Sequence, residues 1–460
     1  MRVAKADEST YAAESDSRFS DFTSVHFLMK YNQHNALAPF VFLVAGVFFF
    51  AGCTNSSSTS KTATTIGTPD DPAAIAALEK AGCRLKKNAD GIVTEIAVSS
   101  DSDFSETMKH LSGIPNVTIA RFGGPGMNDK GMQFLSSLKS LKRLDLTDCE
   151  KAGDETLKVV STMPTIEVLT LRRVGFSDAG LEPIRNLSKL RAMDLRNTNV
   201  TDVGVAHLEG IKTLIDVQLE NSKVTDAGVE HLRGLPLKSL NLNYTVVTDG
   251  CMPAIGSITT LESLQMDTSR ITDVGMVEVA KLKKLKRFGC RQADIGREGI
   301  KHLAELKELT RLELRETTID DASLEIISQL PKLSFLDIGE CKVLKGKTIG
   351  ELGKLTGLTC LELREIKKVK DDNFAALETL TNLTELNLEA TRISDASVPT
   401  ILKMQKLERL SVAGTQMDNE GILELSKLPA LKWLDLRNCQ PKPETVAALK
   451  AAKPDLEIVE

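Results

Sequence analysis

Aromatic side chains are scarce in this chain of 460 residues: they make up 4% of it, with one tryptophan and three tyrosines. Hydrophobic residues still account for 42%, so the core must be filled mainly by aliphatic side chains. The chain also lacks a large excess of one charge, because it has 58 basic and 63 acidic residues and a net charge of −5. That balance gives no bias toward nucleic acid, and the sequence predicts no nucleic-acid partner.

Cysteines are few as well, eight in the whole chain, and seven of them are scattered without the pairing of a disulfide framework. We expect these seven to behave as small buried hydrophobic residues. They are Cys83, Cys149, Cys251, Cys290, Cys341, Cys360 and Cys439.

Motifs for catalysis or for cofactor binding are lacking. Gly346-Lys347-Thr348 lies where a phosphate-binding loop would lie, but that motif requires a glycine at position 341, which is Cys341. His207 and His231 occupy equivalent positions 24 residues apart, yet no third metal ligand is placed beside them. The sequence therefore predicts no catalytic residue, no metal site and no cofactor, and the chain is not expected to be an enzyme.

What the chain does contain is a repeat. From Leu190 it reads L-R-A-M-D-L-R-N-T-N-V-T-D-V-G-V-A-H-L-E-G-I, and the next residues place similar side chains at nearly the same offsets. The pattern L-x-x-L-x-L-x-x-(T/S/C)-x-(I/V)-(T/S)-D-x-G-(L/V)-x-x-L-x-x-L recurs about fifteen times from Val93 onward, at steps of 23 to 25 residues. A final fragment, Leu456-Glu457-Ile458, begins one more strand.

Each repeat combines a strand with a helix. Leu309-Thr-Arg-Leu312-Glu-Leu314 alternates apolar and polar residues, which predicts a half-buried strand. Residues 177–187 place apolar residues three apart, which predicts a helix that Ser177 or Asp178 would cap. One repeat cannot bury its leucines, so the repeats must stack. Strands pack about 4.8 Å apart and helices about 8–10 Å apart, so the stack should curve with its strands inside.

This pattern resembles that of the leucine-rich repeat family over about residues 93–460. The resemblance implies a right-handed α/β solenoid with a parallel sheet on the concave face and short helices on the convex face. It also implies a scaffold that binds a protein or peptide. The ninth position departs from many members, since it holds threonine, serine or cysteine in place of asparagine. A hydroxyl satisfies fewer backbone groups than an amide, so we expect the stack to be held mainly by leucine burial.

The front of the chain has a different character. Residues 1–28 show no periodicity and are interpreted as disordered or as an extension upstream of the true start, which is either Met1 or Met29. Residues 29–53 combine Lys30, an apolar run over 40–50 and Ala51-Gly52-Cys53, which together predict a secretory signal peptide. The last three residues resemble the bacterial lipoprotein box, which implies lipidation of Cys53.

Two further segments precede the repeats. Residues 54–71 are polar and read as a flexible tether, and residues 72–92 are expected to form a capping helix and lead-in over the first repeat. The chain is thus predicted to be lipid-anchored in a bacterial cell envelope, at the outer membrane or the cell surface. The alternatives are an uncleaved membrane anchor, and a cytoplasmic adaptor similar to substrate receptors built from such repeats.

The concave face carries the candidate site. The fifth position of the strands is mostly acidic or amide, and the seventh forms a broken arginine stripe. Mutual pairing of these charges is one interpretation, and a groove for a partner bearing carboxylates is the other; a glycan ligand is disfavoured by the few aromatic side chains. Aromatic residues are typical interface anchors. The predicted partner-binding residues are Arg172, Arg196, Tyr244, Arg291, Arg315, Phe335, Arg364, Trp433 and Arg437.

Overall fold

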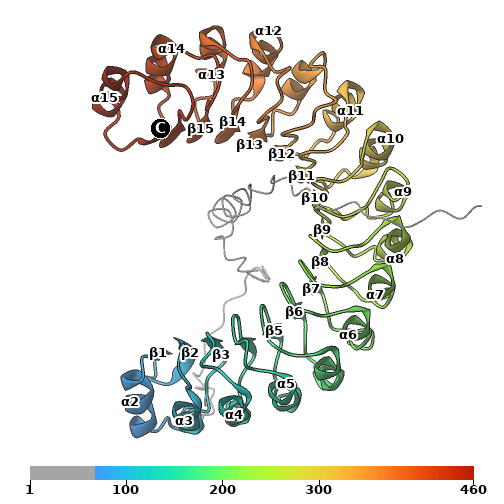
Figure 1. The fold of residues 1–460 in the computed structure, drawn as a ribbon, viewed down its shortest axis with the longest axis vertical. Helices are drawn as coiled ribbons and strands as arrows, with labels where there is room; N and C mark the ends of the chain where they lie inside the picture. Colours follow the sequence, from blue (N-terminus) through green and yellow to red (C-terminus); the bar gives the residue numbers. More distant parts are fainter. Residues whose placement is uncertain (1–67) are drawn as a thin grey trace, which may run out of the picture. The chain divides into compact units, whose positions relative to one another are not determined.

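The computed structural model describes residues 68–460, and the predictions for residues 1–67, Cys53 included, lie outside them. The described residues form one repeat array, which Figure 1 shows as an open arc with strands along its inner side and helices along its outer side. The predicted α/β solenoid, with strands inside and helices outside, is therefore confirmed.

Seventeen strands within residues 68–460 form a single sheet. β1 runs antiparallel to β2, and from β2 onward every strand pairs in parallel with the next strand of the sequence. The strands are β1 Arg84–Lys87, β2 Val93–Ser99, β3 Ile119–Gly123, β4 Arg143–Asp145, β5 Val168–Thr170, β6 Ala192–Asp194, β7 Asp216–Gln218, β8 Ser239–Asn241, β9 Ser263–Gln265, β10 Arg287–Gly289, β11 Arg311–Glu313, β12 Phe335–Asp337, β13 Cys360–Glu362, β14 Glu385–Asn387, β15 Arg409–Ser411, β16 Trp433–Asp435 and β17 Glu457–Val459.

The outer side is built from short α-helices and 3₁₀-helices (η). The α-helices are α2 Pro72–Lys80, α3 Ser105–Met108, α4 Asp129–Met132, α5 Asp154–Ser161, α6 Asp202–Ala206, α7 Asp226–Glu230, α8 Met252–Ser257, α9 Met276–Val279, α10 Arg297–Ile300, α11 Asp321–Ile327, α12 Asp371–Phe374, α13 Val398–Ile401, α14 Asn419–Glu424 and α15 Pro443–Ala452. The 3₁₀-helices are η1 Lys109–Gly113, η2 Gln133–Ser137, η3 Asp178–Asn186, η4 Asp249–Cys251, η5 Lys301–Glu305, η6 Ile349–Lys354, η7 Ala375–Thr379, η8 Asp395–Ser397 and η9 Leu425–Lys427.

The core is a set of aliphatic columns that run between the two layers. Leu144 lies opposite Leu169, and Leu169 lies opposite Met193, so each fourth-position side chain contacts the next in register. These residues, like the first-position Leu141 and Leu190, are almost fully buried. Because each column is continuous along the array, every repeat buries the apolar face of its neighbour.

A second ladder of backbone hydrogen bonds continues beyond each strand. The chain turns there through a residue with left-handed φ, such as Asn197 (57°) and Asn221 (52°). The N–H of Asn197 donates to the carbonyl of Glu220 at 2.9 Å, and that of Asn221 donates to Asn243 at 2.9 Å. The turns are thus joined from repeat to repeat as the strands are.

The aspartates of the T-D-x-G segments join neighbouring repeats and do not act as the predicted helix caps. The Asp178 carboxylate accepts from the Thr201 N–H (2.9 Å) and hydroxyl (2.5 Å) of the following repeat. The Ser177 hydroxyl donates to Asp154 of the preceding repeat and accepts no N–H of its own helix, which is the 3₁₀-helix η3. The capping prediction for Ser177 and Asp178 was therefore wrong, because the same side chains find partners between repeats.

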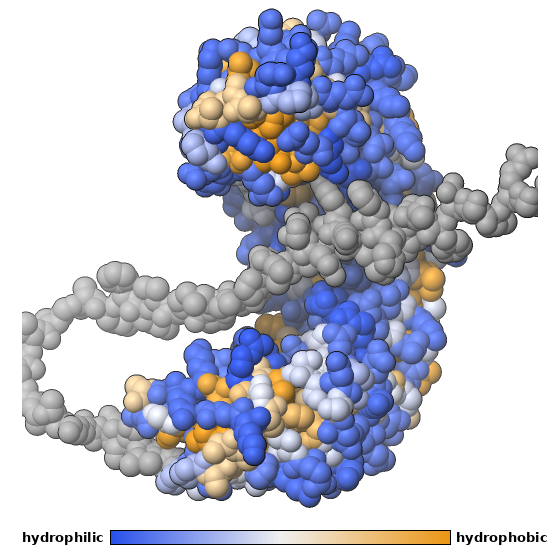
Figure 2. Space-filling model, turned by 60° about the vertical axis from the view of Figure 1, so that its left-hand side comes forward, coloured by the Kyte–Doolittle hydropathy of each residue, from blue (hydrophilic) through white to orange (hydrophobic). Residues whose placement is uncertain are grey.

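Both ends of the array are formed by elements outside the repeat pattern. Helix α2 buries Leu78 against the first repeat, and the N–H of Asp71 donates to the carbonyl of Gly113 at 2.8 Å. At the other end, Ile458 of β17 lies opposite Leu434 of β16. Figure 2 shows hydrophobic residues reaching the surface near both ends of the arc.

Six of the seven cysteines within residues 68–460 are buried, Cys439 is partly buried, and all seven are free thiols. Cys341 occupies the ninth position of its repeat, and its thiol donates to the carbonyl of Leu314 at 3.2 Å. Burial raises the pKa of the Cys341 thiol to about 11. At the same position, the Thr245 hydroxyl donates to the carbonyl of Leu242 at 2.6 Å. Threonine and cysteine thus each satisfy one backbone carbonyl.

Candidate functional site on the concave face

The six predicted arginines lie along the inner side of the sheet. Each follows its strand by two residues, as Arg196 follows Asp194 of β6, and therefore projects from the same face as the fifth position. Phe335 and Trp433 are the first residues of β12 and β16 on that face. Tyr244 differs: it follows β8 by three residues in a left-handed turn (φ 56°). It lies in the turn just beyond the strand, and its part in the concave site stays a prediction.

Most of these arginines are bound to acidic residues of the same face. Arg196 contacts Asp194 at 2.6 Å, and Arg437 contacts Asp435 at 2.6 Å, each within one repeat. Both arginines also donate through Nε to the same carboxylates, which makes the contacts bidentate. The mutual-pairing interpretation therefore describes these two residues.

Arginines in the middle of the array bridge neighbouring strands. Arg291 contacts Asp267 and Glu313 at 3.0 Å each. Glu340 is shared by Arg364 at 3.3 Å and Arg315 at 4.0 Å. Burial by itself lowers the pKa of Arg291, but the neighbouring carboxylates of Asp267 and Glu313 raise it above its ordinary value. These bridges hold the guanidinium groups in place.

Arg172 is the exception among the predicted arginines. Its Nε is buried and forms no hydrogen bond, and the side chain makes no ion pair within residues 68–460. Arg172 can therefore bind a carboxylate of a partner without first breaking an internal contact.

The two concave aromatic residues are covered by arginines that the sequence analysis did not single out. The guanidinium of Arg311 lies 3.3 Å from the ring centroid of Phe335, and that of Arg409 lies 4.3 Å from Trp433. Both pairs join third positions of adjacent strands. A comparison of the third positions of successive repeats in the sequence would have identified Arg311 and Arg409. Each pair presents an apolar ring beside a positive charge.

A buried carboxylate and a partly buried one lie side by side at the centre of this face. Asp337 of β12 and Glu362 of β13 are register partners, and Asp337 is 5% exposed. Burial raises the pKa of Asp337 to about 6, against the opposing effect of Arg315 and Arg291. Burial and the neighbouring Asp337 raise the pKa of Glu362 to about 7. The charge of the central concave face therefore changes near neutral pH.

The Gly346-Lys347-Thr348 segment is a turn whose amides are already occupied. The Asp321 carboxylate accepts from the N–H groups of Lys345 (3.1 Å), Gly346 (3.0 Å) and Lys347 (3.4 Å). A phosphate would need these donors, so the geometry matches the turn and not a phosphate-binding loop.

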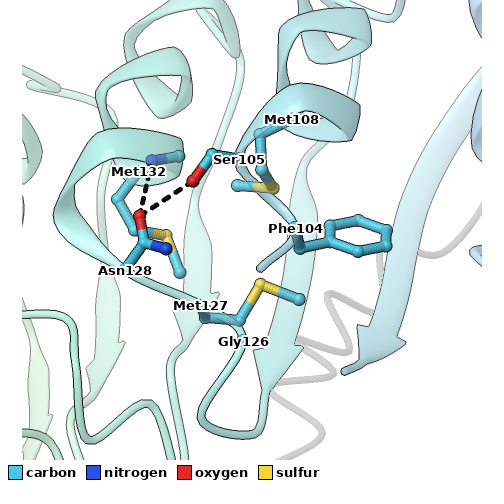
Figure 3. Close-up of a pocket in the computed structure, with 8 residues that line it drawn as sticks. Phe104, Ser105, Met108, Gly126, Met127, Asn128 and Met132 are labelled. Carbon is cyan, nitrogen blue, oxygen red and sulfur yellow. Dashed lines mark hydrogen bonds between the residues drawn. The ribbon is translucent and has the colours of Figure 1, made fainter. Parts of the chain in front are cut away.

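A small pocket lies between the first and second repeats, where Phe104 and Met108 of the first repeat face Met127 and Met132 of the second (Figure 3). Its polar atoms bind each other: the Ser105 hydroxyl donates to Asn128 at 2.9 Å, and Asn128 accepts from the Gly131 N–H at 3.1 Å. The pocket is lined by buried packing residues and its polar groups are satisfied, so it offers little to a ligand.

No group of three or more His, Cys, Asp or Glu side chains in residues 68–460 is arranged to hold a metal. On the outer side, His231 contacts Glu209 at 3.1 Å, and His207 contacts Arg185 at 3.0 Å. None of the helices between residues 68 and 460 combines the length and the apolar character needed to cross a membrane.

The sequence profile of the family described as a leucine-rich repeat region matches this chain over residues 125–372 and 214–453. The chain therefore belongs to the leucine-rich repeat family. Proteins of this family are typically non-catalytic scaffolds for protein–protein interaction. No curated protein matches the sequence.

The following solved structures resemble the chain at low sequence identity. A TDR receptor is 16% identical and aligns with 79% of this chain and 67% of its own at a TM-score of 0.51. An internalin of Listeria monocytogenes is 18% identical (85% of this chain, 95% of its own, TM-score 0.39). A leucine-rich repeat protein of Leptospira interrogans is 17% identical (80% and 90%, TM-score 0.48). Similarity at this level concerns the fold alone.

Proposed function

We propose that this chain is a receptor-like scaffold that binds a protein or peptide partner along its concave face while a lipid on Cys53 holds it in a bacterial envelope. The observation that carries the first part is the row of arginine and aromatic side chains held in fixed positions on an uninterrupted parallel sheet. Arginine and aromatic residues are the types most enriched at interface hot spots. Arg172, which has no ion-pair partner, and the ring of Trp433 are the strongest anchors of this surface.

Panning a random-peptide phage library against the full chain tests the binding surface. Peptides that the chain selects should lose about tenfold or more in affinity with Arg172→Glu or Trp433→Ala, as expected for hot-spot residues. Arg185→Glu on the outer side is the matched control, because this side chain is half exposed and lies on η3. Selected peptides whose affinity is the same for all three variants would place binding elsewhere and refute the concave site.

The lipid anchor is supported by the sequence Ala51-Gly52-Cys53 behind an apolar run. Mass spectrometry of the N-terminus from the membrane fraction of a bacterial host tests it directly. Loss of residues 1–52 with a diacylglyceryl group on Cys53 is the expected result. An intact, unlipidated N-terminus in the cytosol would contradict the anchor and favour the cytoplasmic adaptor.

A further inference from the structure

Two neighbouring repeats depart from the common pattern on the rim where the strands end. In the first, Lys345-Gly-Lys347-Thr takes the place of the T-D-x-G segment and Lys342 precedes it. In the second, Lys370-Asp-Asp-Asn takes that place and Lys367-Lys368-Val precede it. Both repeats are 25 residues long, one more than most. In repeat proteins such insertions map to loops on one face, which is often the binding face.

The first of these loops is held rigidly by its own framework. The Asp321 carboxylate binds three successive amides of the loop, those of Lys345, Gly346 and Lys347. Gly346 has φ +84°, and a Cβ there would lie 2.7 Å from the carbonyl oxygen of Lys368. Glycine is therefore required where the two loops meet.

One asparagine side chain ties the two loops together. Asn373 Nδ2 donates to the carbonyl of Gly346 (3.0 Å) and to that of Lys368 (2.8 Å), and its Oδ1 accepts from the Lys370 N–H at 3.0 Å. The lysines of both loops thus project from one continuous backbone surface that is formed before any ligand arrives, which lowers the cost of binding.

The positive charges of this surface are largely unneutralised. Lys370 contacts Asp372 at 3.1 Å. Five further exposed lysines have no ion-pair partner within residues 68–460, namely Lys342, Lys345, Lys347, Lys367 and Lys368. Asp321 and Asp371 are hydrogen-bonded to the loop amides and to Ser394 and Ser397, and neither forms an ion pair with these lysines. Glu365 pairs with Arg364. In a chain of net charge −5, this local excess of positive charge is distinctive.

We propose that this lysine rim, residues 342–347 and 367–370, is a second docking surface and that it binds an acidic segment of a partner protein. Val343, 45% exposed among the lysines, offers an apolar contact that an acidic peptide with one aliphatic side chain would fill. Neighbouring repeats lie about 4.8 Å apart at the strands, and side chains on one face of an extended peptide recur about every 7 Å. Two adjacent loops therefore suit a short peptide segment better than a broad membrane plane.

This proposal does not depend on the concave site or on the lipid anchor. The rim lysines belong to the segments after β12 and β13, and not to the inner face of the sheet. Binding to the rim therefore remains measurable if the concave variants have no effect.

Fluorescence anisotropy of the full chain with a fluorescein-labelled peptide of alternating glutamate and leucine tests the proposal. The triple variant Lys345→Glu, Lys347→Glu, Lys368→Glu should weaken binding about tenfold or more, because three exposed charge contacts become repulsive. Binding should also weaken with added salt, and the matching lysine–leucine peptide should not bind.

The control is a second triple charge reversal, Lys284→Glu, Lys307→Glu, Lys403→Glu, at exposed lysines without ion pairs in other repeats. It changes the net charge equally and should leave the affinity within about threefold. An equal loss in both triple variants, or no binding of the acidic peptide, overturns the proposal. Binding to phosphatidylglycerol vesicles in place of the peptide overturns it in favour of a membrane surface.

Discussion

Tyr244 occupies a backbone conformation that bulky side chains rarely adopt. Its φ is 56°, and the equivalent turn residues include Asn197, Asn221 and Gly414, which tolerate left-handed φ. The side chain is 48% exposed and stands beside Val246, which is 50% exposed. Other repeats place ordinary side chains such as Arg173, Thr268 and Gln292 in the same left-handed turn, so the strain belongs to the repeat turn, and burial of the Tyr244 ring does not offset it.

Replacing Tyr244 by asparagine should raise the free energy of unfolding by about 0.5–1 kcal/mol, since asparagine is better suited to left-handed φ. Urea unfolding followed by circular dichroism measures the change. Asn197→Tyr makes the reverse exchange at an equivalent turn and should lower stability by a similar amount. A lower stability for Tyr244→Asn would show that the ring packs usefully within the chain.

Asp337 should make the stability of the array depend on pH. Its pKa in the folded chain is about 6, above that of an unfolded aspartate near 4, so the folded state holds a proton that the unfolded state releases. Its contribution to stability is therefore fully present below about pH 4 and is lost as pH rises toward 6.

The variant Asp337→Asn should remove about 2–3 kcal/mol of this pH dependence between about pH 4 and pH 6. Urea midpoints at pH 4.5 and pH 7.5 measure it, with Asp455→Asn at an exposed position as the control. An unchanged difference between the two midpoints in Asp337→Asn would show that this carboxyl is not the source.

At the scale of the element, the T-D-x-G segment works as a joint between repeats. The Asp202 carboxylate accepts from the N–H and the hydroxyl of Thr225, at 2.7 Å each. The same aspartate lies so close to the next repeat that a Cβ on Gly228 would be 2.4 Å from its Oδ1. The aspartate, threonine and glycine of the pattern are therefore parts of one contact.

Gly228→Ala should destabilise the chain by about 2 kcal/mol, because the methyl group displaces the Asp202 carboxylate and leaves the Thr225 amide unsatisfied. Gly210→Ala, where a Cβ meets nothing within 4 Å, should stay within about 0.5 kcal/mol of the parent. Chemical unfolding of both variants measures the contrast. Equal effects at the two glycines would mean that the joint contributes little.

At the scale of the whole molecule, each repeat contacts only its neighbours, so stability depends on how the ends are covered. Helix α2 covers the first repeat with Leu78, which is 1% exposed. Leu78→Asp should undock this cap, and hydrogen exchange should then accelerate in β2 and β3 more than in β9. Ala76→Asp, on the exposed side of the same helix, should leave the exchange unchanged. Uniform acceleration along the array would indicate a single cooperative unit.

The repeat period alone was sufficient to predict the fold. Leucines at the first, fourth and sixth positions recur in one phase, and only stacking buries them, so Leu169 and Leu195 fall in the core as the pattern requires. The arginine stripe was predictable for the same reason, because alternation along a strand decides which side chains share a face.

Only the tertiary structure decided what those side chains do. Ser177 and Asp178 are residue types that commonly cap helices, yet each binds a group in an adjacent repeat. The spacing of residues within one repeat does not reveal these partners. The ion pairs of Arg291 with Asp267 and Glu313 likewise depend on neighbouring strands. The sequence determined the fold because burial follows from periodicity; partners across repeats depend on distances that appear only when the stack forms.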